Sequence, residues 1–225
     1  MAGVLELVLA DARTPSGGHA HSGGLEAAIA EGLTITEVPG YIRARLRTVG
    51  RCEAALAACA AGAGRVAELL ALDLEAAART PSEPLRRASG QLGRGLLRTA
   101  CTWWPGDRLL GGYRAQSALT PRPVALGAIA RAGGVAPAEA ARLSLYDDAA
   151  TVAAAAVKLL PVDAAVASGW LVALAGELEG LAGGGGAGGV GGAGGVGAWP
   201  PSTSTPLLDR RSLAHARADR RLFVS

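Results

Sequence analysis

The stretch AEAARLSLYDDAATVAAAAVKLLP, residues 138–161, indicates the fold class. It is rich in alanine and leucine, which favour helices, and it contains no glycine and no proline before Pro161. Because proline cannot continue a helix, we expect this helix to end at Leu160 and a second apolar helix to run over residues 164–181. Lys158 and Pro161 interrupt the apolar run, which favours two helices of a soluble protein over a membrane span.

Helical patterns continue along the rest of the chain. The sequence predicts a long helix with its N-cap at Thr36, Pro39 in its first turn and apolar residues through Leu56. We expect its arginines to lie mostly on the solvent-exposed face: Arg43, Arg45, Arg47 and Arg51. No segment alternates apolar and polar residues as a strand does. We therefore predict an all-α fold, a single-domain orthogonal or antiparallel helical bundle over residues 1–182.

Composition narrows the class of protein further. The chain has 225 residues, of which 50% are hydrophobic but only 4% aromatic, so small side chains must build closely packed helices. The net charge of +3 is spread among arginines and acids and gives no footprint typical of nucleic-acid binding. Three cysteines without a CxxC pair fit a reducing compartment. The N-terminus lacks a basic leader and contains Glu6, so we expect a cytoplasmic protein.

Glycine marks two segments with different meanings. The expected helix LRRASGQLGRGLLRTACTWW contains glycines at 90, 93 and 95, each unfavourable in a helix by up to about 1 kcal/mol. They indicate a close helix contact, a kink, or a surface against which something else lies. Residues 183–205, rich in glycine and then in proline and serine, are predicted to form a flexible linker. Residues 206–225 regain apolar spacing and are predicted to form a docking tail.

The end of the tail combines arginines with Leu222 and Phe223. Such arginines usually form a solvated face, but arginine beside an aromatic residue at a chain end is typical of an interface anchor, and we favour binding. Nucleic-acid binding by the tail is the alternative, which the lack of a basic helix with interleaved aromatic residues weighs against.

The turn PSGGHAHSGGLE, residues 15–26, is the candidate for chemistry. His19, His21 and Glu26 could bind a metal ion and support a metal-dependent enzyme, or they could be polar loop residues. Its glycines could form an anion-binding nest, but their spacing matches no phosphate motif, which favours a tight turn. Ser22 lacks the nucleophile-elbow pattern.

Other polar and aromatic residues have structural interpretations. Cys52 and Cys59 would share a helix face as buried thiols. Asp147 and Asp148 point about 100° apart on a helix, so we interpret them as a solvated or partner-contacting edge. The aromatic residues beside the following loop are interpreted as core: Trp103, Trp104 and Tyr113.

Several motifs occur in the order of a known family. PSGGHAHSGGLE resembles the N-terminal signature of the urease accessory protein UreF family, and HARADRRLFVS resembles its C-terminal one. Between them, LRRASGQLGRGLL, PVALGAIARAGG and SLYDDAATVAAAAVKLLPVD are similar to internal stretches of the family. The chain departs from the pattern at Pro121, Asp147, Asp148, Ala216 and Arg220, and the glycine-rich segment has no counterpart.

The resemblance implies an all-helical scaffold that is not an enzyme. Such a scaffold would bind the accessory protein UreD (also called UreH), recruit the GTPase UreG and help to deliver nickel to apo-urease, as a homodimer within the complex and with no tightly bound cofactor. It places the UreD contact at Arg221, Leu222 and Phe223, and a further partner contact at His215. It assigns contributions to the UreG or dimer surface to Ser22, Gly24, Leu25, Glu26, Tyr41 and Lys158, and partner contacts to His19 and His21.

Overall fold

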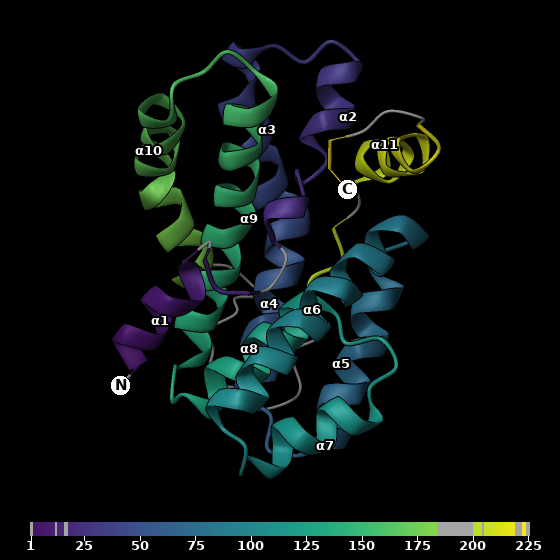
Figure 1. Ribbon diagram of the computed structural model, residues 1–225, viewed down its shortest axis with the longest axis vertical. Coiled ribbons are helices and arrows are strands. Elements are labelled where there is room, and N and C mark those ends of the chain that lie inside the picture. The colour runs from purple at the N-terminus through teal and green to yellow at the C-terminus, as the bar shows by residue number, and fades with distance from the viewer. Residues whose placement is uncertain are drawn as a thin grey trace.

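The computed structural model describes residues 2–11, 13–15, 18–183, 200–203, 205–218 and 222–223. Within these ranges the chain is helical and contains no strand, which confirms the predicted all-α class (Figure 1). The α-helices are α1 (Ala2–Ala10), α2 (Leu25–Ala30), α3 (Val38–Arg45), α4 (Arg51–Ala61), α5 (Val66–Ala78), α6 (Glu83–Trp103), α7 (Arg108–Gln116), α8 (Arg122–Ala132), α9 (Pro137–Leu159), α10 (Ala164–Gly183) and α11 (Pro206–Ala216).

Helix α4 lies at the centre and packs against both α8 and α9. One apolar cluster surrounds α8, with Leu56, Leu97 and Ile129 among its buried members. A second cluster lies between α3, α9 and α10 and includes Ile42 and Leu145. Since α4 and α9 contribute to both clusters, they join the two halves of the bundle.

The contact between α4 and α8 depends on small side chains. A Cβ atom on Gly127 would lie 2.1 Å from the carbonyl oxygen of Ala57 and 2.7 Å from Cβ of Ala60. Only glycine on one helix and alanine on the other allow the two backbones to approach this closely. The alanine-rich composition therefore sets the helix separation at the centre of the fold.

Glycines of α6 serve the same purpose against the loop that precedes α8. A Cβ atom on Gly93 would lie 1.9 Å from the carbonyl oxygen of Thr120, and one on Gly90 would lie 2.8 Å from that of Leu119. Of the three interpretations that the sequence left open, a surface against which another segment lies is the one found at Gly90 and Gly93.

The helical run that was predicted from Thr36 through Leu56 has its N-cap two residues earlier, at Thr34. Thr34, and not Thr36, forms the capping box, in which Glu37 accepts a hydrogen bond from the Thr34 backbone N–H at 2.8 Å. A 3₁₀ turn (Ile35–Glu37) leads into α3, and a π-helical segment (Leu46–Gly50) joins α3 to α4. The predicted helix through Leu56 is thus continuous but wider in its middle turn.

Among the described residues, α10 alone is long and apolar enough to cross a membrane by length and composition. Leu174 and Leu178 pack into the second apolar cluster, whereas Val166 and Val172 are exposed. Only 17% of its most apolar 18-residue window is buried, and length and composition alone are weak grounds for a membrane span.

We expect Gly93→Ala to destabilise the protein by about 1–3 kcal/mol, because the added methyl group meets the Thr120 carbonyl. Gly169→Ala in α10 is the matched control, since the added methyl group would meet no other part of the protein within 4 Å. Alanine there should stabilise the helix by about 0.5–1 kcal/mol. Urea denaturation followed by circular dichroism measures both. Equal effects of the two substitutions would contradict the close packing.

Candidate functional site

The C-terminal tail meets the start of α2 at Glu26. Its two carboxylate oxygens accept hydrogen bonds from the backbone N–H groups of Leu222 at 2.6 Å and Phe223 at 2.9 Å. His215, on α11, places Nε2 3.2 Å from the Phe223 carbonyl oxygen and 3.6 Å from the Glu26 carboxylate. Because a carbonyl oxygen only accepts, Nε2 carries the proton. We call Glu26, His215, Leu222 and Phe223 the terminal clasp.

Phe223 is the apolar part of the clasp. Its side chain is 3% exposed and belongs to the cluster between α3, α9 and α10, a burial that stabilises by about 2 kcal/mol. The Nζ atom of Lys158 lies 5.2 Å from the centre of the ring and donates a hydrogen bond to the His19 carbonyl oxygen at 3.2 Å. Leu222 points the other way and is 64% exposed.

The turn before Glu26 needs its glycines. Gly23 and Gly24 have φ angles of +61° and +79°, in the left-handed region that favours glycine. A Cβ atom on Gly24 would also lie 2.6 Å from Cδ1 of Leu208, on α11, and 3.0 Å from the hydroxyl of Tyr41. This finding agrees with the tight-turn interpretation. The turn lets α11 and α3 approach the start of α2, where Leu25 is fully buried.

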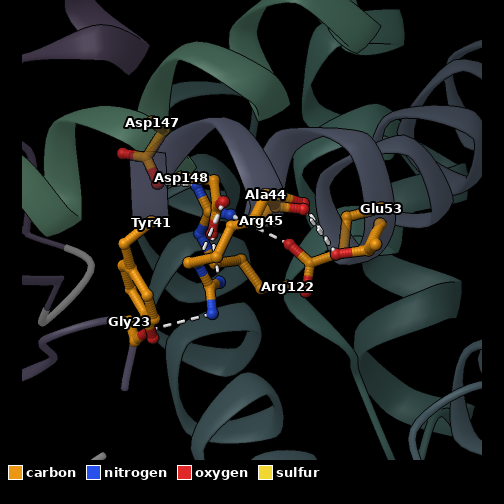
Figure 2. Close-up of polar contacts among 9 residues, drawn as sticks. Gly23, Tyr41, Ala44, Arg45, Glu53, Arg122, Asp147 and Asp148 are labelled. Carbon is orange, nitrogen blue, oxygen red and sulfur yellow. Dashed lines mark hydrogen bonds and ion pairs between the residues drawn. The ribbon is translucent and has the colours of Figure 1, made fainter. Parts of the chain in front are cut away.

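A buried ion pair between α3 and α9 supports this turn (Figure 2). Arg45 on α3 pairs with Asp148 on α9, and their side chains are 11% and 8% exposed. Arg45 Nη1 and the Tyr41 hydroxyl both donate to the Gly23 carbonyl oxygen at 2.8 Å. Burial alone would lower the pKa of Arg45, but the charge and hydrogen bond of Asp148, together with Tyr41 and Glu53, raise that pKa above its ordinary value. The guanidinium is therefore always charged and fixes the Gly23 carbonyl.

These positions correct two expectations from the sequence. Arg45 does not lie on a solvent-exposed face, and Asp148 is not a solvated edge, because each is the other's buried partner. The spacing of Asp148 from its apolar neighbours on α9 already indicated a buried position. Asp148 is three residues after Leu145 and four before Val152, both buried, so it lies on the core face of α9. Cys59 is also exposed and not buried, although Cys52 is buried as expected.

A second charged group lies beside the first. Arg122, at the start of α8, bonds to Asp147, and its Nη1 lies 3.7 Å from Glu53 of α4 (Figure 2). Burial raises the pKa of Glu53, and the charge of Arg122 opposes this effect. Both groups border a cavity of about 170 Å³ that His21 also lines. Burial, then the charge of Arg122, lowers the pKa of His21.

The chain returns to this cavity immediately before α11. Arg79 donates to the carbonyl oxygens of Pro200 at 2.8 Å and Pro201 at 3.1 Å. The Thr203 hydroxyl donates to the Thr48 carbonyl oxygen at 2.7 Å, in the π-helical segment. Within the predicted linker 183–205, residues 184–199 and 204 lie outside the described residues. Residues 200–203 are fixed to α4 and α5.

The structure brings most of the predicted partner-binding residues together. Glu26, His215 and Phe223 form the clasp, Lys158 contacts the Phe223 ring, and Tyr41 holds the Gly23 carbonyl. The remaining predicted residues of the turn adopt several environments: His19 is exposed, whereas His21, Ser22 and Leu25 are buried, and Gly24 packs under α11. Arg221 lies outside the described residues.

The alternative interpretation of the turn was a metal site of an enzyme, with His19, His21 and Glu26 as ligands. In the described part of the chain, no group of three or more histidine, cysteine, aspartate or glutamate side chains is placed to hold a metal ion. The Glu26 carboxylate is instead occupied by two backbone N–H groups. The arrangement at the turn thus acts as a mechanical attachment of the tail.

A family model named UreF matches residues 34–175. The chain belongs to the UreF family. Similar proteins named urease accessory protein UreF occur in Mycobacterium sp. (strain JLS), at 35% identity over 221 residues, and in Mycolicibacterium vanbaalenii, at 36% over 222 residues. Each alignment covers 97% of both chains. The UreF of Mycobacterium tuberculosis H37Rv is 35% identical over 224 residues, again with 97% of each chain covered.

Membership of the UreF family confirms the resemblance seen in the sequence. The matched range of the family model contains Tyr41, Arg45, Asp148 and Lys158, but neither end of the terminal clasp. The relatives align over nearly the full length and so extend the similarity to both ends. The chain is accordingly a urease accessory protein and not an enzyme.

We expect Arg45→Met to destabilise the protein by about 3–5 kcal/mol, because it leaves Asp148 buried without its partner. Arg45→Met with Asp148→Leu should recover part of this loss, since no unpaired charge remains. Arg47→Met is the matched control on the same helix run. It breaks an exposed pair with Glu177 and should cost less than about 1 kcal/mol. Urea denaturation of each variant measures its free energy of unfolding and tests these expected costs. Equal costs for Arg45→Met and Arg47→Met would contradict a buried pair.

Glu26→Ala should release the end of the chain without unfolding the bundle. It removes the acceptor of two backbone N–H groups, so we expect cleavage by trypsin near Arg217 to accelerate by at least about tenfold. Glu31→Ala is the control, because in the described part of the chain Glu31 contacts the tail through side-chain ion pairs with Arg210 and Arg211 and not through a backbone group. It should change the cleavage rate by less than about threefold. If both variants are cleaved as slowly as the wild type, the clasp does not hold the tail.

Proposed function

We propose that the chain acts in urease maturation as a scaffold whose clasped tail binds UreD. With UreD bound, it recruits the GTPase UreG, so that nickel reaches apo-urease. In this proposal the scaffold is cytoplasmic and works as a homodimer within the complex, and nickel is cargo for the assembly and not a resident cofactor of this chain.

The observation that carries the proposal is the division of the tail into two faces. The inward face consists of Leu208, Ser212, His215 and Phe223, all buried against the chain's own bundle. The outward face carries Leu207, Leu213 and Leu222, which are 50%, 44% and 64% exposed. We call these three residues the leucine row.

Exposed leucines on a fixed support are typical of a binding surface. An unattached tail would lose much conformational entropy on binding, whereas the clasp has ordered the tail beforehand. Glu31 adds surface pairs with Arg210 and Arg211, on the same helix as two of the three leucines. The leucine row is therefore presented to a partner without a further ordering cost.

The inward residues have a different role from the one the sequence assigned. Phe223 was expected to touch UreD and His215 to touch a partner, and both side chains are buried within the chain. They position the leucine row, as do Tyr41 and Lys158 through the turn and the Phe223 ring. Direct contact with UreD then falls to Leu222 and to the exposed leucines of α11.

Leu213→Asp with Leu222→Asp should lower the affinity for UreD by at least about tenfold, because two charges would enter a desolvated apolar contact. Leu74→Asp with Val172→Asp is the matched control, as these side chains are 67% and 77% exposed on α5 and α10. Co-expression with the UreD of the same cell, followed by affinity capture and quantification, measures the effect. Circular dichroism checks that both variants remain helical.

Retained capture of UreD by the leucine-row variant would refute tail docking, and failure of the wild type to capture UreD would refute the proposed function. Equal losses in both double variants would point to a general effect of charge. UreG added to the captured complex tests recruitment, which the proposal predicts only when UreD is bound.

A further inference from the structure

The exposed side of α6 carries a line of arginines. Arg87, Arg94 and Arg98 are exposed and are spaced by seven and four residues, so they lie within about 40° of one another around the helix. We call these three residues the arginine row, which extends about 16 Å along the axis. Glu83 is the one acid within α6, and it pairs with Arg87 through an exposed contact at 2.5 Å.

The rest of the row lacks acidic neighbours. Within the described ranges, Arg94 and Arg98 take part in no ion pair, although many other arginines of the chain do. Arg94 has one long hydrogen bond, at 3.4 Å, to the Leu119 carbonyl oxygen. Two like charges four residues apart destabilise a helix by a few tenths of a kcal/mol, about 0.2–0.5. The fold tolerates this repulsion without placing a carboxylate there.

The helix that carries the row is rigidly placed. Gly90 and Gly93 hold the helix against the loop before α8, with no room for a side chain, and Arg94 reaches the Leu119 carbonyl oxygen of the same loop. The start of α6 also lies beside the tail, since the buried Ser82 hydroxyl lies 2.6 Å from that of Ser212 on α11. Helices α6 and α11 are neighbours (Figure 1).

We propose that the arginine row binds a carboxylate-rich surface of the protein partner that also covers the leucine row. This inference rests on the proposed function for the identity of that partner, UreD, but the row's preference for carboxylates stands on α6 itself. Arginine binds carboxylates through two parallel N–H donors, which gives such a contact a defined orientation. The leucine row supplies apolar contact, and the arginine row supplies orientation and a faster encounter.

A protein partner fits the row better than a nucleic acid. The arginine row has no aromatic side chain between its charges for stacking on bases, and the chain's net charge is only +3. Binding to duplex DNA would also require many phosphate contacts for useful affinity. Three arginines in one line match a short acidic helix or loop.

The test uses the full chain with Arg94→Glu and Arg98→Glu. The matched control is Arg108→Glu with Arg114→Glu, which changes the net charge equally on exposed positions of α7, at the opposite end of the molecule from α11 (Figure 1). Fluorescence anisotropy with a labelled decaglutamate peptide in about 50 mM salt isolates the row from any partner, because screening is weak there. We expect about tenfold weaker binding in the row variant and little change in the control.

The second arm measures capture of UreD in about 50 mM and about 500 mM salt. The row variant should lose about tenfold in affinity at low salt and much less at high salt, whereas loss from the leucine-row variant should persist at both.

Equal peptide binding by the row and control variants would overturn the proposal, as would unchanged UreD affinity of the row variant at low salt. Tighter binding of the wild type to a short DNA duplex than to the peptide would also overturn it. If the wild type fails to capture UreD, the proposed function is refuted. The anisotropy measurement with the decaglutamate peptide then still tests whether the arginine row binds carboxylates.

Discussion

The ion pair between Arg45 and Asp148 is the contact on which the turn before α2 and the attachment of the C-terminal tail depend. It joins α3 to α9 inside the bundle and leaves one guanidinium N–H group for the Gly23 carbonyl. That carbonyl fixes the turn whose next helix begins with Leu25 and Glu26. A charge that cannot be neutralised inside the bundle must keep its partners, so the turn has one conformation in the folded state. The clasp then follows, because Glu26 faces the backbone of Leu222 and Phe223.

Close packing of small residues makes this arrangement rigid. Gly127 brings α8 onto α4, and Gly93 brings α6 onto the loop before α8. With few large side chains to interlock, the fold is specified by backbone proximity and by a few buried polar contacts. The buried bond from Tyr113 to Asp73, at 2.6 Å, is another such contact.

The all-α class could be predicted from the sequence because helical periodicity and strong breakers such as Pro161 are local properties. The glycines of α6 indicated a close helix contact, a kink or a surface for another segment, and the sequence alone could not choose among these. The partner of Arg45 could not be predicted, since its charge is typical of a solvated face and Asp148 is 103 residues away. The phase of Asp148 with Leu145 and Val152 was the available signal. The clasp could not be predicted either, because residues 26 and 223 are neighbours only in the folded chain.

Family membership and the geometry of the structure both draw attention to the tail as the candidate partner contact. The resemblance placed the partner contact there, and the structure separates residues that hold the tail from residues that face outward. Amide hydrogen exchange of Leu222 and Phe223 tests this organisation most directly, because it reports whether the chain end is held in solution. We expect both amides to be protected in the wild type and to exchange at nearly the rate of an unstructured peptide when Arg45 and Asp148 are replaced by Met and Leu. Exchange at the unstructured rate in the wild type, or full protection in the variant, would contradict the link from the buried ion pair to the clasp.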